Sequence, residues 1–139
     1  MSIEKTLTII KPVAFKENHT GEILAIINKS GFRISAIRLI QMSLRQAKAF
    51  YAEHEGRPFY DALTEFMSSA PVIVAILEKD NAVIDYRNLI GCTDPAKASE
   101  GTIRKLFGTN LQANAVHGSD SVESAERECN FFFPFCERY

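Results

Sequence analysis

The sequence lacks the features that would place it in a membrane or on a nucleic acid. Its longest apolar stretch, residues 72–77, is far shorter than the about 20 residues of a membrane-spanning helix. Residues 1–5 show no basic segment leading into an apolar one, so no targeting leader is expected. The 16 Lys and Arg residues balance 17 Asp and Glu residues, and a net charge of −1 argues against a general nucleic-acid or membrane-surface partner.

Cysteine is also scarce. The sequence has three cysteines, an odd number, and they lack the spacing of a zinc site: Cys92, Cys129 and Cys136. Reduced thiols in a cytoplasmic protein are the simple interpretation. The 139 residues correspond to one domain, 1–139, and 46% hydrophobic residues are enough for a core without disulfide or metal support.

Several short motifs of known enzyme classes are missing as well. The sequence has no G-x-x-x-x-G-K-[ST] and no G-x-G-x-x-G, so it carries neither a P-loop nor a Rossmann fingerprint. H-E-x-x-H, C-x-x-C and a serine in G-x-S-x-G are absent too. Any site must therefore be built from other residues.

Apolar patterning predicts strands that alternate with helices. The expected strands are 6–10, 32–42 and 72–77, while a strand near 115–118 stays open. The expected helices are 20–30, 44–54, 60–69, 81–90 and 121–128, with a short turn of helix at 102–107. A slip in alternation at residues 36–37 indicates a bulge or a strand buried on both faces. The order predicts a sandwich in which helices pack on one sheet.

Polar residues at the predicted helix ends suggest how these helices begin and end. Thr20 is placed to cap the first long helix, and Gly31 follows its end. Residues 43–46 fit a capping box. Asp80 is expected to cap the helix that Gly91 closes.

A dense polar cluster occupies residues 114–121. Its His117 could act as base, metal ligand or nucleophile, and a carboxylate on the second ring nitrogen would stabilise the charge that nucleophilic attack creates. Glu128, about two turns along the next helix, is the candidate for that role. Gly118 would let a substrate approach the ring, and a helix that begins at Ser121 would point free N–H groups at anions. The alternative is a turn histidine bonded to backbone.

Basic and aromatic residues elsewhere could complete a site. Lys11 ends the first strand, where α/β folds bind ligands; the alternative is a solvated strand end. Arg87, in the predicted helix 81–90, could belong to the site; the alternative is a surface charge with a buried stem. Arg104 lies near a loop that holds Thr93. Phe59 lies in a break between helices, where core packing is the commoner role.

Two histidines and the end of the chain receive simpler interpretations. His19 and His54 have no constellation of polar residues around them. The apolar residues 131–135 would form an exposed patch if free, so we expect them to pack on the body or on another subunit.

The segment 114–121, Asn-Ala-Val-His-Gly-Ser-Asp-Ser, resembles the active-site signature of nucleoside diphosphate kinases. The resemblance covers nearly the whole chain, and this motif is highly specific. Further matching segments follow in family order: 8–12, 21–23, 51–54, 57–59, 91–95 and 101–104.

This resemblance implies a fold and an activity. The fold would be a ferredoxin-like α+β sandwich, with four antiparallel strands and helices on one side, which supplies the missing strand. The activity would be ping-pong transfer of the γ-phosphoryl group from a nucleoside triphosphate to a nucleoside diphosphate through His117. Mg²⁺ would arrive on the nucleotide phosphates without a protein metal site. The chain would form a homo-oligomer, a hexamer in preference to a tetramer.

The resemblance also implies roles for single residues. His117 would carry the phosphoryl group, Glu128 would hold its second nitrogen, and Ser119 would help to place both. Lys11 would contact the ribose and the transferring phosphate, with Tyr51 beside it. The other nucleotide contacts would be Arg87, Thr93 and Arg104 on the phosphates, Asn114 on a ribose hydroxyl, and Phe59 and Leu111 on the two sides of the base.

Four departures from the family pattern bear on rate and assembly. They are Val13, Ala70, the pair 105–106 and the Phe-rich end, and none is a proposed chemical participant. Two other function classes stay open. One is a nucleotide sensor on the same fold that binds without turnover. The other is a single-strand nucleic-acid binder, against which the balanced charge argues.

Overall fold

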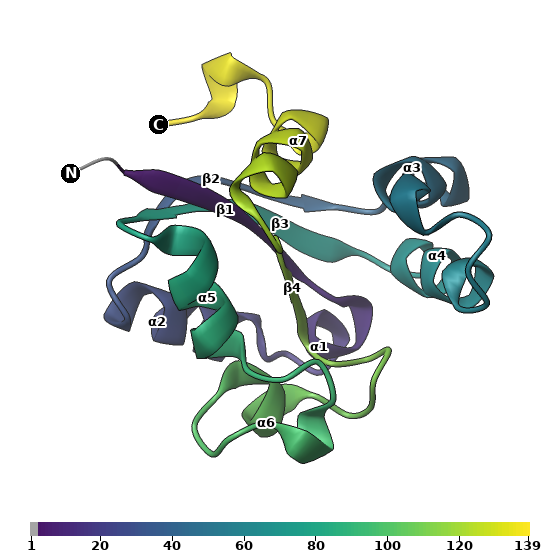
Figure 1. The fold of residues 1–139 in the computed structure, drawn as a ribbon, viewed down its shortest axis with the longest axis horizontal. Helices are drawn as coiled ribbons and strands as arrows, with labels where there is room; N and C mark the ends of the chain where they lie inside the picture. Colours follow the sequence, from purple (N-terminus) through teal and green to yellow (C-terminus); the bar gives the residue numbers. More distant parts are fainter. Residues whose placement is uncertain (1–2) are drawn as a thin grey trace.

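A computed structural model describes residues 3–139 and contains one four-stranded antiparallel sheet (Figure 1). Its strands are β1 (Glu4–Ile10), β2 (Arg33–Ile40), β3 (Val72–Lys79) and β4 (Val116–Gly118), in the order β2-β3-β1-β4. The short β4 pairs with the end of β1, where Ile9 lies opposite His117. The predicted ferredoxin-like sheet is confirmed, and β4 is the strand that patterning left open.

Seven α-helices surround this sheet in the described chain. They are α1 (Pro12–Lys16), α2 (Thr20–Lys29), α3 (Leu44–Phe50), α4 (Tyr60–Ser68), α5 (Ala82–Ile90), α6 (Ile103–Phe107) and α7 (Val122–Phe132). Short 3₁₀ turns lie at Ala52–His54, Pro95–Lys97 and Phe135–Glu137. The helix expected at 44–54 therefore ends at Phe50. None of these helices is long and apolar enough to cross a membrane.

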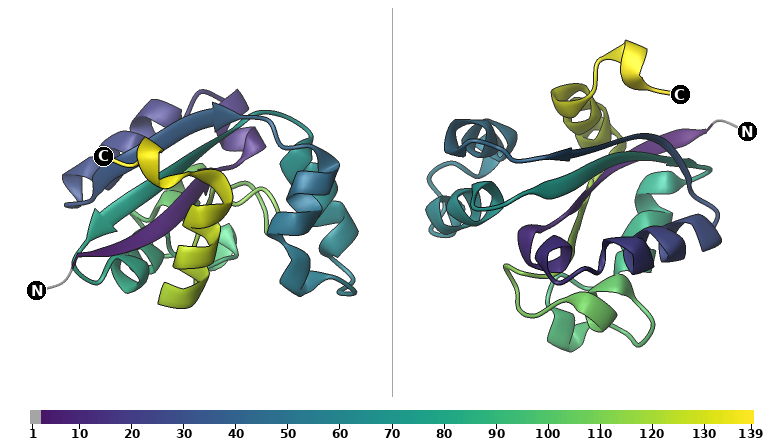
Figure 2. Two further views of the ribbon diagram at one scale, coloured as in Figure 1. Left: turned by 90° about the horizontal axis from the view of Figure 1, so that it is seen from above. Right: turned by 180° about the vertical axis from the view of Figure 1, so that it is seen from behind.

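Helices cover both faces of the sheet, which corrects the expectation of helices on one side. The cause is β3, whose side chains are apolar in both directions. Val74 packs in a cluster with Phe132 of α7, whereas Ala75 packs in another cluster with Ile27 of α2 and Tyr86 of α5. Figures 1 and 2 show α7 on one side of the sheet, α2 and α5 on the other, and the α3–α4 pair at one end.

Three of the predicted helix ends are confirmed. The Gln46 backbone N–H donates to Ser43 Oγ at 3.1 Å, and the Ser43 N–H donates to Gln46 Oε1 at 2.9 Å, which completes the capping box of α3. Gly31 follows α2 with φ +93° and Gly91 follows α5 with φ +90°, a conformation that favours glycine.

Two other caps are wrong. Thr20 lies inside α2, behind His19 at the cap position. Asp80 does not cap α5, because Asn81 occupies the cap position in a left-handed conformation. Instead Glu4 of β1 accepts a hydrogen bond from the Val83 N–H at 2.9 Å. A partner so distant in sequence leaves no local signal.

Replacing Glu4 with alanine should destabilise the protein by about 1 kcal/mol, because the first turn of α5 loses its acceptor. Glu4→Gln keeps an acceptor oxygen and is the matched control. Urea unfolding of the three proteins measures the difference. Equal stability of wild type and Glu4→Ala would show that water replaces the carboxylate without cost.

The bulge and the apolar end are both present in the structure. The register of β2 against β3 shifts between Ile34 and Ala36, one position before the slip seen in the sequence. Phe133 is buried, and the Tyr139 N–H donates to the Ser35 carbonyl at 2.8 Å. The end of the chain therefore packs on the body beside β2, as expected, while Phe135 stays 89% exposed.

Candidate active site

Three adjoining cavities gather the predicted site residues. The first, about 430 Å³, is lined by Lys11, Phe59, Leu63, Thr93, Arg104, Leu111, Gln112 and Asn114. The second, about 200 Å³, is lined by Phe50, Tyr51, Glu53, His54, Arg87, His117, Gly118, Asp120 and Glu128. A third, about 490 Å³, shares Arg87 with the second and shares Thr93 and Arg104 with the first. Of the predicted residues, Ser119 alone lines none of these three cavities, because it lies behind Glu128.

The His117 ring is held by a carboxylate. Its Nε2 lies 2.8 Å from Glu128 Oε1, which also accepts a bond from Ser119 Oγ at 2.7 Å. The Leu7 N–H donates to Ser119 Oγ at 3.1 Å and so orients this hydroxyl toward Glu128. β1, β4 and α7 thus each supply one part of the arrangement. The alternative of a turn histidine bonded to backbone does not hold.

The charge on Glu128 decides which ring nitrogen is free. Burial alone would raise the pKa of Glu128, but hydrogen bonds from His117 and Ser119 and the charge of Arg127 hold that pKa below its usual value. An ionised carboxylate accepts a proton donor, so Nε2 of His117 carries the ring proton. Nδ1 then keeps the free lone pair and is the nucleophilic atom.

Aromatic rings surround the imidazole. Phe50 meets it edge to face with centroids 5.5 Å apart, and Tyr51 lies at 6.5 Å. The Tyr51 hydroxyl is buried and has no partner within residues 3–139. Burial, with the charge of Glu128, raises the pKa of Tyr51 above its usual range, so the hydroxyl keeps its proton.

Gly118 lines the cavity of His117 and also allows close packing of β4 on α5. A Cβ at this position would lie 3.0 Å from Tyr86 Cδ2 and 3.1 Å from Ile90 Cδ1, so a larger residue would require these side chains to shift. The expected free N–H groups of α7 are also partly used. Ser121 Oγ accepts from the Ser124 N–H at 3.0 Å, and a Ser124 hydrogen bond keeps the pKa of Asp120 below its usual value beside this helix start.

Lys11 is buried, so the alternative of a solvated strand end is wrong. Its Nζ donates to Asn114 Oδ1 at 2.7 Å, and Asn114 Nδ2 donates to the Thr93 carbonyl at 2.9 Å. Burial, with the positive charge of Arg104, lowers the pKa of Lys11 to about 7. An anion placed here would restore its charge.

Arg104 remains inside the site despite the unusual pair that follows it. Its Nη1 donates to the Gly91 carbonyl at 3.1 Å and its Nη2 to the Val116 carbonyl at 2.9 Å. Burial lowers the pKa of Arg104 to about 10, which leaves the guanidinium charged at neutral pH. Leu106 points to solvent, being 53% exposed, so the 105–106 departure does not displace Arg104.

The first cavity is lined by two exposed apolar side chains, Phe59 at 47% and Leu111 at 63% exposed. Phe59 is therefore not a core residue. His54, which the sequence left without a role, lies 5.4 Å from the Phe59 ring and 6.3 Å from the Tyr51 ring. The spacing of Tyr51 and His54 could have indicated this, since residues three apart share a helix face.

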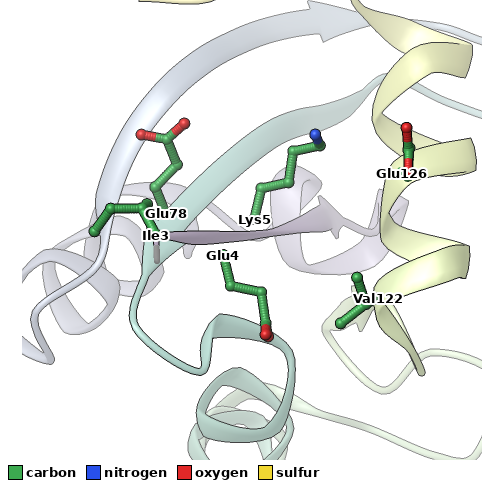
Figure 3. A pocket seen from close by; sticks show the side chains of 6 residues that line it. All are labelled: Ile3, Glu4, Lys5, Glu78, Val122 and Glu126. Carbon is green, nitrogen blue, oxygen red and sulfur yellow. The ribbon is translucent and has the colours of Figure 1, made fainter. Parts of the chain in front are cut away.

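A cavity of about 460 Å³ lies elsewhere, beside the start of β1 (Figure 3). Its lining is Ile3, Glu4, Lys5, Glu78, Val122 and Glu126. Figure 3 shows Lys5 and Glu78 on one side of β1 and Glu4 on the other, directed at α5. Three carboxylates against one ammonium group repel anions, whereas the first and third cavities are lined by Lys and Arg side chains without any carboxylate. These two cavities, with the adjoining cavity of His117, are therefore the candidate site. Residues 3–139 contain no group of three His, Cys, Asp or Glu that could hold a metal ion.

The site combines a carboxylate-held histidine, in one cavity, with cations and exposed apolar side chains in the adjoining cavities, and these groups could serve as a nucleophile, phosphate ligands and a surface for an apolar ring. The family model described as nucleoside diphosphate kinase matches residues 4–137. The chain belongs to the nucleoside diphosphate kinase family, whose members are phosphotransferases.

Individual relatives agree along the whole chain. The nucleoside diphosphate kinase of Paracoccus denitrificans is 55% identical over 133 residues, covering 96% of this chain and 95% of its own. That of Chlamydia caviae is 51% identical over 131 residues, covering 94% and 93%. The crystal structure of the Aquifex aeolicus enzyme has a TM-score of 0.97 at 40% identity, covering 99% of this chain and 100% of its own.

A second solved structure includes a ligand. The nucleoside diphosphate kinase of Halobacterium salinarum, in complex with CDP, has a TM-score of 0.95 at 33% identity and covers 99% of this chain and 92% of its own.

Proposed function

We propose that this protein transfers the γ-phosphoryl group of a nucleoside triphosphate to a nucleoside diphosphate through a phosphohistidine on His117. The observation that carries the proposal is the 2.8 Å bond from Nε2 to Glu128, which leaves the Nδ1 lone pair free in a cavity that Arg87 also lines. Such an enzyme balances nucleotide pools and makes triphosphates other than ATP. A complex of the Halobacterium salinarum relative with CDP supports a nucleoside diphosphate as ligand.

The reaction has two balanced halves. In the first, Nδ1 attacks the γ-phosphorus, the bond from that phosphorus to the β–γ bridging oxygen breaks, and the diphosphate leaves with the bond electrons. In the second, a terminal oxygen of the acceptor diphosphate attacks the same phosphorus and the bond to Nδ1 breaks. Glu128 stabilises the positive charge that the ring gains when it is phosphorylated.

The remaining residues position the nucleotide. Arg87, Arg104 and Thr93 would hold the phosphates, and Lys11 and Tyr51 would donate to the oxygens of the transferring group and the ribose. This pattern fits phosphoryl transfer, which depends on positioning and on positive charge. Mg²⁺ would come with the nucleotide and neutralise phosphate oxygens.

Asn114 would bind a ribose hydroxyl, and the base would lie between Phe59 and Leu111. Stacking on a ring and an apolar side chain does not distinguish bases, because every base has a π-face. The proposed enzyme therefore accepts several nucleotides. We propose further that residues 1–139 act as one domain in a homo-oligomer, with a hexamer preferred. The exposed Phe135 supports contact with another subunit. The free thiols of Cys92, Cys129 and Cys136 support a cytoplasmic location.

Initial-rate kinetics tests the two-step route. With ATP varied at several fixed concentrations of a second diphosphate, double-reciprocal plots should give parallel lines, the pattern of a ping-pong enzyme. Intersecting lines would contradict a phosphorylated intermediate. Binding of the diphosphate without turnover would favour the nucleotide sensor instead.

Nucleotide binding is expected to take up a proton above about pH 7. The pKa of Lys11 is about 7, so part of the side chain is neutral there, and a bound phosphate would raise that pKa. Affinity for ADP should then fall as pH rises, by up to about tenfold per pH unit while the bound pKa exceeds the pH. Calorimetric titration in buffers of different ionisation enthalpy measures the uptake. Lys11→Arg, which stays charged, should abolish it, and equal uptake in that variant would exclude Lys11 as the source.

A further inference from the structure

Arg127 of α7 links three groups that surround the His117 site. Its Nη2 lies 3.6 Å from Glu128 Oε2 and 3.6 Å from Glu53 Oε1. Its Nη1 donates to the Phe50 carbonyl at 3.4 Å. The side chain is 44% exposed, and Arg127 is not among the residues that line the three site cavities.

The contact with Glu128 places a cation beside the carboxylate that holds His117. The two oxygens of Glu128 are used differently, because Oε1 meets His117 and Ser119 whereas Oε2 meets Arg127. The Glu128 side chain is only 5% exposed, so bulk water is a poor substitute for a missing partner. A cation at Oε2 therefore opposes rotation of the carboxylate and adds to the larger effects of His117 and Ser119 that lower the pKa of Glu128.

The second contact is with the backbone of Phe50, the residue whose ring packs against the imidazole. Phe50 lies edge to face with His117, and Arg127 holds the Phe50 carbonyl. The Glu53 contact ties the same guanidinium to the turn that follows Tyr51. One side chain thus connects α7 to the segment that carries Phe50 and Tyr51.

We propose that Arg127 is a positioning residue for phosphoryl transfer, which holds Glu128 and the Phe50 segment in place around His117. This inference rests on the proposed function of His117. Arg127 acts through its neighbours, so its loss should reduce the rate of His117 phosphorylation more than nucleotide affinity.

The pH dependence of the reaction separates this role from a purely structural one. Removing the cation raises the affinity of Glu128 for protons, so activity should be lost at a higher pH on the acid side. Arg127 Nη2 lies as close to Glu53 Oε1 as to Glu128 Oε2. Without Arg127, these two carboxylates would lose the cation that they share. The titratable groups that face Glu128 from the packed elements are His117 on β4, Tyr51 after α3, and Arg127 and Cys129 on α7.

Single-turnover phosphorylation by ATP and Mg²⁺, followed by mass spectrometry between about pH 5 and 9, tests the proposal. Arg127→Gln should phosphorylate about three- to tenfold more slowly at neutral pH, and the acid limb of its rate profile should move to higher pH. Arg127→Lys keeps the charge and should keep the limb in place. Arg45→Gln removes an exposed arginine of α3 and should change neither quantity.

Each outcome decides a separate point. An Arg127→Gln profile that is slower but unmoved along the pH axis would show a structural role only and overturn the proposal. A wild-type rate in Arg127→Gln would overturn it as well. A wild-type protein that takes up no phosphoryl group would instead overturn the proposed function of His117. Thermal unfolding of all variants, with Arg127→Lys as the second test, shows whether a slow variant is simply unfolded.

Discussion

His117→Ala should lose phosphoryl transfer by about four to six orders of magnitude, the range seen when a covalent nucleophile is removed. The loss is this large because no other side chain in the described site has a free lone pair in the same position. The His117 ring contacts Glu128 and Phe50. Its removal leaves the basic residues that are proposed to bind the phosphates in place. We therefore expect ADP to bind with nearly unchanged affinity.

The measurement is steady-state transfer from ATP to a second diphosphate, together with calorimetric binding of ADP. His19→Ala is the matched control, since this histidine is at the start of α2 and contacts Glu22 rather than the site. It should keep full activity. Substantial turnover by a clean His117→Ala preparation would show that the phosphoryl group travels by another route.

Glu128→Gln should reduce the rate by about two to four orders of magnitude, the scale on which loss of the charge partner of a catalytic histidine is felt. Glutamine keeps the volume and can still accept from Nε2, but it carries no charge to stabilise the phosphorylated ring. The buried site makes the missing charge costly, because little water can replace it. The expected change is in kcat, with a small change in KM, since Glu128 does not line the cavity in which the ribose and base are proposed to bind.

Ser119→Ala is the informative comparison for this variant. It removes one donor to the same oxygen but leaves the carboxylate charged. Its rate loss should be far smaller than that of Glu128→Gln. Similar losses in both variants would mean that ring orientation, rather than charge, is what Glu128 contributes.

Much of the fold could be predicted from local patterns. β3 is a continuous apolar run, and α3 has a complete capping box within four residues. β4 could not be predicted in this way, because three residues paired only with β1 carry no alternation of their own. The start of α5 was missed for a related reason, since its acceptor, Glu4, comes from another strand.

The candidate site also has a part that could be predicted from the sequence and a part that could not. The His117–Glu128 pair could be proposed because both residues are near each other in the sequence, on a strand and the helix that follows. The resemblance to a known family supplied the other proposed contacts. Burial could not be predicted: only the folded chain encloses Lys11 beside Arg104, and only the approach of α7 to the end of α3 brings Arg127 to Glu53.

The most direct test of the account is the mass of the intact protein after brief incubation with ATP and Mg²⁺. We predict one added phosphoryl group per chain that is labile to acid, maps to His117 and disappears when a nucleoside diphosphate is added. These properties together would establish the phosphohistidine and its transfer. A protein that binds ADP but gains no mass, or that gains an acid-stable group on another residue, would contradict the central claim.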